Sequence, residues 1–228
     1  MTGAGQRPPS SPVCSLAEVE GHDMQQELEV ARWRRAERER LRADRMAMAV
    51  AARQDWAAAL MRHLSAGLSG WLGDPKGRVI SGYWPIKGEA DLRPWLTELH
   101  AAGAIIALPV VVTKASPLVF RHWYPGMVME RGDWNIPVPP ASAKVLHPDL
   151  SLAPLVGWDR ANYRLGYGGG YFDRTLAAAS PRPFVVGVGL QSAELATVFP
   201  QWHDIPMSVI VTDEGVQSNS LSRSGAPR

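Results

Sequence analysis

The stretch that decides the fold is residues 104–112, AIIALPVVV, which is a continuous apolar run. A run of this kind predicts a strand that is buried on both faces of a sheet. Residues 184–190 (FVVGVGL) predict another strand near the C-terminus. Strands buried on both faces belong to parallel sheets that helices cover from either side.

The segments around these two strands alternate in type. Amphipathic patterns predict helices over residues 91–102, 171–179 and 192–199, and shorter apolar runs predict strands over residues 78–84, 118–122, 150–156 and 209–212. Strands that alternate with helices predict an α/β protein, a three-layer α/β/α fold with a largely parallel sheet.

A long helical region precedes this alternation. Residues 25–68 consist mainly of strong helix formers, and neither Pro nor Gly occurs before Gly67, so we expect one long helix or two in succession. Four apolar residues suggest a buried stripe: Met48, Trp56, Leu60 and Leu64. Four arginines at helical spacing share another face: Arg34, Arg38, Arg42 and Arg45.

The ends of the chain differ from its middle. Residues 1–24 and 217–228 are rich in Gly, Pro and Ser without periodicity, so we expect two disordered tails around a single domain over residues 25–216. The single cysteine, Cys14, excludes an internal disulfide and a Cys-based zinc site. With a net charge of +2 and no long apolar run, we expect a cytoplasmic monomer that binds neither nucleic acid nor membranes.

The chemistry concentrates in residues 162–174, NYRLGYGGGYFDR, which follow a predicted strand and lead into a predicted helix. A glycine turn lets the backbone approach a ligand, and the start of a helix attracts anions. Arg164 and Arg174 add cations, and Asp173 is placed to bind Mg²⁺ on a phosphate. The stretch matches neither the P-loop nor clearly the dinucleotide pattern, so a glycine turn without a ligand stays an alternative.

This stretch resembles the signature of the 5-formyltetrahydrofolate cyclo-ligase family, Arg-Leu-Gly-x-Gly-x-Gly-Tyr-Tyr-Asp. Phe172 replaces the second tyrosine, and Gly169 stands where some members carry lysine. The matching residues are Arg164, Leu165, Gly166, Gly168, Gly170, Tyr171 and Asp173.

Two further segments resemble folate-contacting parts of the family. Residues 83–91 (YWPIKGEAD) carry Trp84 and Glu89, and a carboxylate suits the paired N–H donors of a pterin. Glu89 capping the following helix is the alternative. Residues 134–139 (WNIPVP) carry Trp134, whose flat face suits the pterin or aminobenzoyl ring, with a packing role as the alternative.

Two more segments resemble the family's ATP and metal sites. In residues 203–212 (HDIPMSVIVT), Asp204 falls on a metal ligand, but Ser208 stands where the family usually has another aspartate. In the N-terminal basic helix, Arg34 and Arg38 fall on the family's Lys and Arg, while Glu37 takes the place of a leucine. A solvated helix face is the alternative for this stretch.

The resemblance implies conversion of 5-formyltetrahydrofolate and ATP to 5,10-methenyltetrahydrofolate, ADP and phosphate, with Mg²⁺ as cofactor. It implies Arg164 and Tyr171 as catalytic groups and Asp173 and Asp204 as metal ligands. The implied ATP-binding residues are Arg34, Arg38, Arg164, Leu165, Gly166, Tyr167, Gly168, Gly169, Gly170, Tyr171 and Phe172. The implied folate-binding residues are Trp84, Glu89, Trp134, Tyr167, Gly168, Gly169, Gly170 and Tyr171.

Two other functions compete with this one. A paralogue of the same fold could have a different or regulatory role, for example in thiamine-related metabolism. An RNA-binding module could use the basic helix, but Glu37, Glu39 and Asp44 are interleaved with its arginines and weaken that reading.

Overall fold

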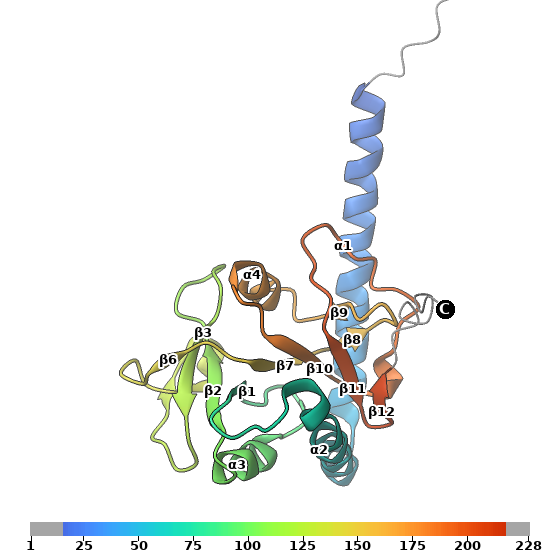
Figure 1. Ribbon diagram of the computed structural model, residues 1–228. Helices are drawn as coiled ribbons and strands as arrows, with labels where there is room; N and C mark the ends of the chain where they lie inside the picture. The colour runs from blue at the N-terminus through green and yellow to red at the C-terminus, as the bar shows by residue number, and fades with distance from the viewer. Residues whose placement is uncertain (1–15, 218–228) are drawn as a thin grey trace, which may run out of the picture.

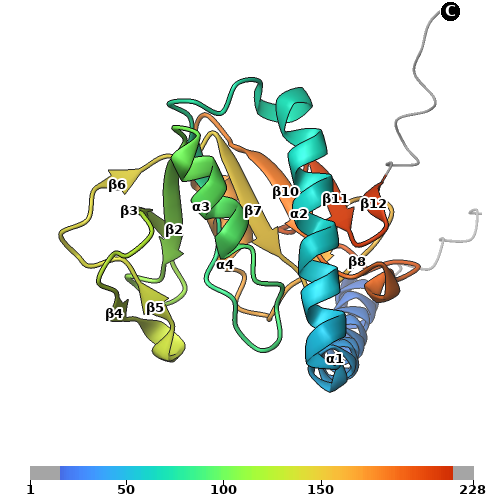
Figure 2. The same ribbon diagram turned by 90° about the horizontal axis from the view of Figure 1, so that it is seen from below.

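The computed structural model describes residues 16–217, with side chains from residue 24 onward. An eight-stranded sheet forms the middle of the fold, and helices lie on both of its sides (Figures 1 and 2). The helices are α1 (Leu16–Ala47), α2 (Val50–Leu72), α3 (Arg93–Ala101) and α4 (Tyr171–Ala178). The strands are β1 (Val79–Ser81), β2 (Ile105–Val110), β3 (Val119–Trp123), β4 (Glu130–Arg131), β5 (Pro137–Val138), β6 (Val145–Leu146), β7 (Leu150–Pro154), β8 (Gly157–Trp158), β9 (Arg164–Leu165), β10 (Phe184–Val188), β11 (Val209–Thr212) and β12 (Gly215–Gln217).

The order of the strands in the sheet is β12-β11-β10-β7-β1-β2-β3-β6. The five central strands pair in parallel, whereas β12 at one edge and β3 and β6 at the other pair antiparallel. The chain places β2 on one side of β1 and later places β7 on the other side. The order therefore reverses between β1 and β7, and ligands of open α/β sheets bind beyond the carboxyl ends of the strands at such a point. The predicted α/β class is confirmed.

Successive residues of the central strands face opposite sides of the sheet. Val186 and Val188 of β10 pack into the core under α2 and α3, while Val185 packs into the core on the other face. That second core takes Leu41 from α1 and Leu176 from α4. Figure 2 shows α2 and α3 in front of the sheet with α4 behind it. Burial on both faces explains why these strands are apolar along their whole length.

The long helical region is two helices that break at Met48 and Ala49. Ala49 has an extended backbone (φ −59°, ψ 151°), and neither Gly nor Pro marks the break. Tertiary packing accounts for it: α2 buries Trp56, Leu60 and Leu64 in the core that it shares with α3. The arginine face of α1 instead packs near the loops beyond the carboxyl ends of the strands. Of the two arrangements expected for residues 25–68, two helices in succession is therefore the one that forms.

The expected helix over residues 192–199 is wrong, since only a 3₁₀ turn, Gln191–Ala193, forms there. The backbone N–H of Leu195 bonds to Trp158 O at 2.8 Å, and that of Val198 bonds to Asp159 Oδ2 at 2.9 Å. These bonds replace the i→i−4 bonds of a helix.

The ends of the domain also differ from the expectation. Helix α1 begins at Leu16, within residues 1–24, where a disordered tail was expected, and Gln217 ends β12. Cys14 and the rest of residues 1–15 and 218–228 lie outside the described residues. Within residues 16–217, no helix combines the length and the apolar character needed to cross a membrane.

Candidate active site

A cavity of about 260 Å³ lies beyond the carboxyl ends of β1, β2 and β7. Trp84 follows β1, Val111 follows β2, and Pro154 ends β7, and all three line it. The cavity therefore occupies the position where the strand order predicts a ligand site.

The glycine-rich loop, residues 166–170, forms one wall of this cavity. Gly168 (φ +94°) and Gly170 (φ +61°) have left-handed backbones, which strain any other residue. Gly170 is the N-cap of α4, and no side chain caps the helix. The first turn of α4 therefore presents N–H groups and a positive dipole end at the cavity, as an anion site requires.

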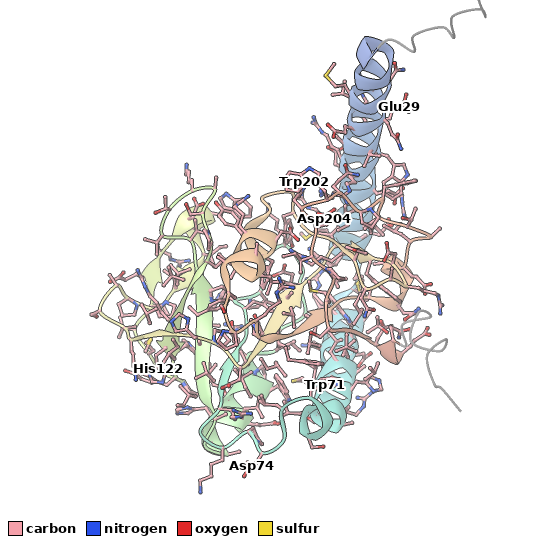
Figure 3. All side chains as sticks on the ribbon, turned by 45° about the horizontal axis from the view of Figure 1, so that its top comes forward. Glu29, Trp71, Asp74, His122, Trp202 and Asp204 are labelled. Carbon is pink, nitrogen blue, oxygen red and sulfur yellow. The ribbon has the colours of Figure 1, made fainter. Side chains whose placement is uncertain are left out.

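Helix α1 supplies two arginines to the cavity, and their surroundings differ. Arg34 donates to Val198 O at 2.8 Å, to Phe199 O at 2.9 Å and to the carboxylate of Asp204. Figure 3 shows Asp204 and Trp202 on the loop that lies beside α1. Arg34 thus ties this loop to the helix.

Arg38 is the less neutralised of these two arginines. Its Nε donates to Gly166 O at 2.8 Å, and it forms no ion pair with any residue of the described chain. Burial and then the charge of Arg34 lower the pKa of Arg38, and Asp204 opposes them. An anion bound in the cavity would relieve this loss of solvation, so Arg38 is suited to a phosphate group.

Two carboxylates at the cavity are held in ion pairs. Arg164 binds Asp173 at 3.1 Å (Nη1–Oδ1) and 3.0 Å (Nη2–Oδ2), and Ile205 N donates to Asp173 Oδ1 at 3.2 Å. Burial raises the pKa of Asp204, but the bonds from Arg34 and Gln201 N outweigh it, and the net pKa is lowered. Asp204 is therefore stabilised as an anion, and Asp173 is held in place by Arg164.

The donor set is compatible with Mg²⁺ on a phosphate. No group of three or more His, Cys, Asp or Glu in the described part of the chain is arranged to hold a metal ion. Mg²⁺ commonly takes only one or two protein carboxylates and fills its shell with water and substrate phosphates. Asp204 Oδ1 faces His203 Nε2 at 3.9 Å, beyond hydrogen-bond distance, and so retains acceptor capacity.

At another part of the wall, Glu89 is nearly buried, with 6% of its surface exposed. Its Oε2 accepts from Ile86 N at 2.9 Å, and its Oε1 accepts from the hydroxyl of Tyr167 at 2.9 Å. That hydroxyl in turn accepts from Arg45 Nη2. An ionised carboxylate offers about four lone-pair positions, so Glu89 keeps acceptor capacity for a ligand.

Two tryptophans line the same cavity. Trp134 is 56% exposed, meets Tyr167 edge-on at 6.5 Å between ring centroids, and has Lys87 Nζ 5.1 Å from its own centroid. Trp84 is half-buried beneath the guanidinium of Arg93, which lies 4.6 Å from its ring centroid. The exposed face of Trp134 is available for stacking on a flat ligand.

The structure gathers the expected site residues around one cavity, with one exception. Leu165 is 1% exposed in the core, where it packs under the loop. Neither Arg45 nor Lys87 was singled out from the sequence as a site residue. Arg45 shares the helical face of Arg34 and Arg38, so its spacing was a usable signal, whereas nothing in the sequence marks Lys87. The sequence did not single out ten further residues that line the cavity: Tyr83, Ile86, Leu108, Pro109, Val111, Leu118, Ile136, Pro137, Pro154 and His203.

The fold and the cavity define an α/β protein with a glycine-rich loop and a helix start at a cavity on the carboxyl edge of its sheet. A model of the 5-formyltetrahydrofolate cyclo-ligase family matches residues 30–213, and the chain belongs to this family.

Relatives and solved structures agree with this membership. A 5-formyltetrahydrofolate cyclo-ligase of Mycolicibacterium smegmatis is 32% identical over 64% of this chain and 79% of its own length, and that of Escherichia coli K12 is 31% identical over 60% and 79%. The NMR structure of Aquifex aeolicus 5,10-methenyltetrahydrofolate synthetase has the same fold, with a TM-score of 0.70, 24% identity, and coverage of 86% of this chain and 95% of that one.

Proposed function

We propose that the protein catalyses the ATP-dependent cyclisation of 5-formyltetrahydrofolate to 5,10-methenyltetrahydrofolate, with release of ADP and phosphate. One observation carries the proposal. A single cavity is lined both by a phosphate-type loop with Arg38 and by a nearly buried carboxylate, Glu89, with an exposed aromatic face, Trp134. A reaction that joins a nucleotide phosphate to a pterin needs both kinds of wall in one place.

The pterin and aminobenzoyl groups of the folate fit the carboxylate and the aromatic residues of the cavity wall. The exposed lone pairs of Glu89 would accept the paired N–H donors of the pterin, and Trp134 would stack on the pterin or aminobenzoyl ring. Trp84 and Tyr167 complete this part of the wall.

The phosphates of ATP fit the glycine-rich loop and Arg38, on the other part of the cavity wall. The N–H groups of residues 166–172 and the guanidinium of Arg38 would bind the phosphates of ATP. Arg34 is already engaged with Asp204, so its part is to hold the loop that carries this carboxylate. Asp173 and Asp204 would hold Mg²⁺, which supplies charge neutralisation to the phosphates when bound.

The reaction needs no nucleophile from the protein. The formyl oxygen attacks the γ-phosphorus, and ADP leaves. N10 of the folate then attacks the formyl carbon and loses its proton, the carbon–oxygen bond breaks, and phosphate carries away the formyl oxygen and takes up the proton. The protein aligns these groups and stabilises charge, and we propose Arg164 of β9 and Tyr171, the first residue of α4, for this role. Tyr167 and Tyr171 also shield the loop from water.

We also propose that the protein acts as a cytoplasmic monomer, as expected from its sequence. The competing paralogue function would keep the fold and the phosphate wall but has no need for a buried carboxylate in the same cavity as Trp134. The pairing of Glu89 with Tyr167 supports the folate function over this alternative.

The test is to mix the purified protein with 5-formyltetrahydrofolate and Mg-ATP and to follow the near-ultraviolet absorbance of methenyltetrahydrofolate. We expect absorbance that grows only when ATP is present, and Glu89→Gln should raise the KM for the folate without changing ATP affinity. Wild-type protein that binds ATP but makes no product would move the assignment to the paralogue function. Unchanged folate kinetics in Glu89→Gln would overturn the substrate assignment alone.

A further inference from the structure

Three side chains from three separate segments form a continuous chain of contacts that leads from Arg45, outside the cavity lining, to Tyr167 and Glu89 in the cavity wall. Arg45 lies on α1, Tyr167 in the glycine-rich loop, and Glu89 in the segment after β1. Arg45 Nη2 donates to the hydroxyl of Tyr167, which donates to Glu89 Oε1 at 2.9 Å. Arg45 Nη1 also donates to Leu155 O at 3.3 Å, which fixes the guanidinium at the end of β7. We call this chain the Arg45–Tyr167–Glu89 relay.

The burial of Arg45 is hard to explain by packing alone. Its exposed fraction is 3%, its Nε has no hydrogen-bond partner, and it forms no ion pair within the described part of the chain. Burying a cation without a counterion is costly, and an apolar side chain of similar length would fill the same space. The charge of Arg45 is therefore the feature that needs an explanation, and the nearly buried anion it reaches is Glu89.

We propose that Arg45 is a positioning residue for folate recognition, which acts through Tyr167 to keep Glu89 ionised and fixed in one orientation. The proposal rests on the function proposed above. By engaging one lone pair of Oε1, the Tyr167 hydroxyl leaves the remaining lone pairs of the carboxylate for the ligand. A carboxylate so held accepts two N–H donors, whereas a protonated one presents a donor to a donor.

The electrostatic surroundings of Glu89 support this role. Burial raises the pKa of Glu89, and the bond from Ile86 N, the charge of Arg45, the Tyr167 hydroxyl and the charge of Lys87 oppose the rise. Removing Arg45 would therefore let Glu89 take up a proton at a higher pH. The charged and titratable groups that act on Glu89 are Arg45 of α1, Lys87 on its own segment, and Tyr167. Tyr83 and Asp91 lie on the same segment, and Arg42 of α1 faces the ring of Tyr167.

The chain offers a matched control in Arg42. Its guanidinium lies 5.6 Å from the ring centroid of Tyr167, and that of Arg45 lies 5.7 Å from it. Both arginines come from α1, but only Arg45 bonds to the hydroxyl. Arg45→Met and Arg42→Met thus remove the same charge at nearly the same distance from the Tyr167 ring, but only Arg45→Met breaks the relay and removes a charge that acts on Glu89.

The experiment compares steady-state kinetics of the two variants across a pH series. We expect Arg45→Met to raise the KM for 5-formyltetrahydrofolate about tenfold, the effect of losing a hydrogen bond that involves a charged group. The KM for ATP should stay the same, and the acid limb of kcat/KM for the folate should move to higher pH. Arg42→Met should change neither the KM for the folate nor the position of the acid limb. A purely structural role of Arg45 would not move the pH profile.

Two further measurements keep the proposal testable whatever the first one gives. The titration of the Glu89 side-chain carbon, followed by NMR in ligand-free protein and assigned with Glu89→Gln, should shift to higher pH in Arg45→Met and not in Arg42→Met. If Arg45→Met does not fold, Tyr167→Phe cuts the relay at its middle and should shift the acid limb in the same direction.

The outcomes separate the relay from the proposed function. Equal pH profiles and equal Glu89 titrations in Arg45→Met and Arg42→Met would overturn the relay while leaving the ligase activity in place. Wild-type protein without activity would overturn the proposed function, and the NMR titration would still decide whether Arg45 controls the ionisation of Glu89.

Discussion

The ion pair between Arg164 and Asp173 gives the sharpest prediction about stability. The side chains are 6% and 16% exposed, and two N–O contacts of 3.1 and 3.0 Å join them. Asp173→Asn keeps an oxygen for Arg164 or for Ile205 N but removes the charge, so Arg164 is left buried without its counterion. Breaking a buried pair from one side costs about 3–5 kcal/mol, and the retained oxygen places this change near the lower value, about 3 kcal/mol.

The measurement is urea unfolding of wild type, Asp173→Asn and the control Asp91→Asn. Asp91 pairs with Arg93 at 2.6 Å, but the two side chains are 43% and 39% exposed, so its loss should cost less than about 1 kcal/mol. The comparison requires equal m-values in all three proteins. If both variants lose the same free energy of unfolding, the burial argument for Arg164 is refuted. If Asp173→Asn loses more stability than Asp91→Asn, the burial argument stands, and lost activity in an Asp173 variant then reflects a displaced Arg164 as well as a lost metal ligand.

Three further predictions concern the cavity wall. Burial raises the pKa of Glu89 in the folded state, so its contribution to stability should be greatest at acid pH and be lost as the pH rises through the folded pKa. The difference in unfolding free energy between wild type and Glu89→Gln should change with pH in the same way. A difference that stays constant with pH would contradict this prediction. Gly168→Ala, at φ +94°, should cost about 1 kcal/mol or more in thermal or urea unfolding, while Gly166→Ala, which has open space around its Cβ and no positive φ, should cost less, and equal losses would show that the strain argument is wrong. Arg38→Met should raise the KM for ATP at least about tenfold with the folate KM unchanged, since it loses a charge-assisted contact, and an unchanged KM for ATP would remove Arg38 from the phosphate wall.

The parallel sheet could be predicted because burial on two faces leaves a clear mark on the sequence. Residues 104–112 and 184–190 are apolar throughout, and they form β2 and β10 in the middle of the sheet. The two-residue strands such as β4 and β5 leave no such mark, because so short a pairing is set by contacts with other segments. The expected helix over residues 192–199 failed for the same reason: Asp159 and Trp158 bind its backbone N–H groups.

The site could be predicted where a local pattern carries the chemistry, as in the glycine-rich loop. The partners of the expected residues could not, because they lie far away along the chain. Asp204 is 170 residues from Arg34, and Tyr167 is 78 residues from Glu89. Arg34 was expected to grip phosphates, and only the fold shows that its guanidinium is already bound to the 198–204 segment. The role of Arg45 depends on a hydroxyl 122 residues away.

The central claim is that the formyl oxygen of the folate receives the γ-phosphoryl group of ATP within this cavity. It is tested most directly with 5-formyltetrahydrofolate whose formyl oxygen is ¹⁸O, incubated with the protein and Mg-ATP. We predict that methenyltetrahydrofolate forms and that the ¹⁸O appears in the released inorganic phosphate. Product with the ¹⁸O in water, or ATP hydrolysis without methenyltetrahydrofolate, would contradict the account.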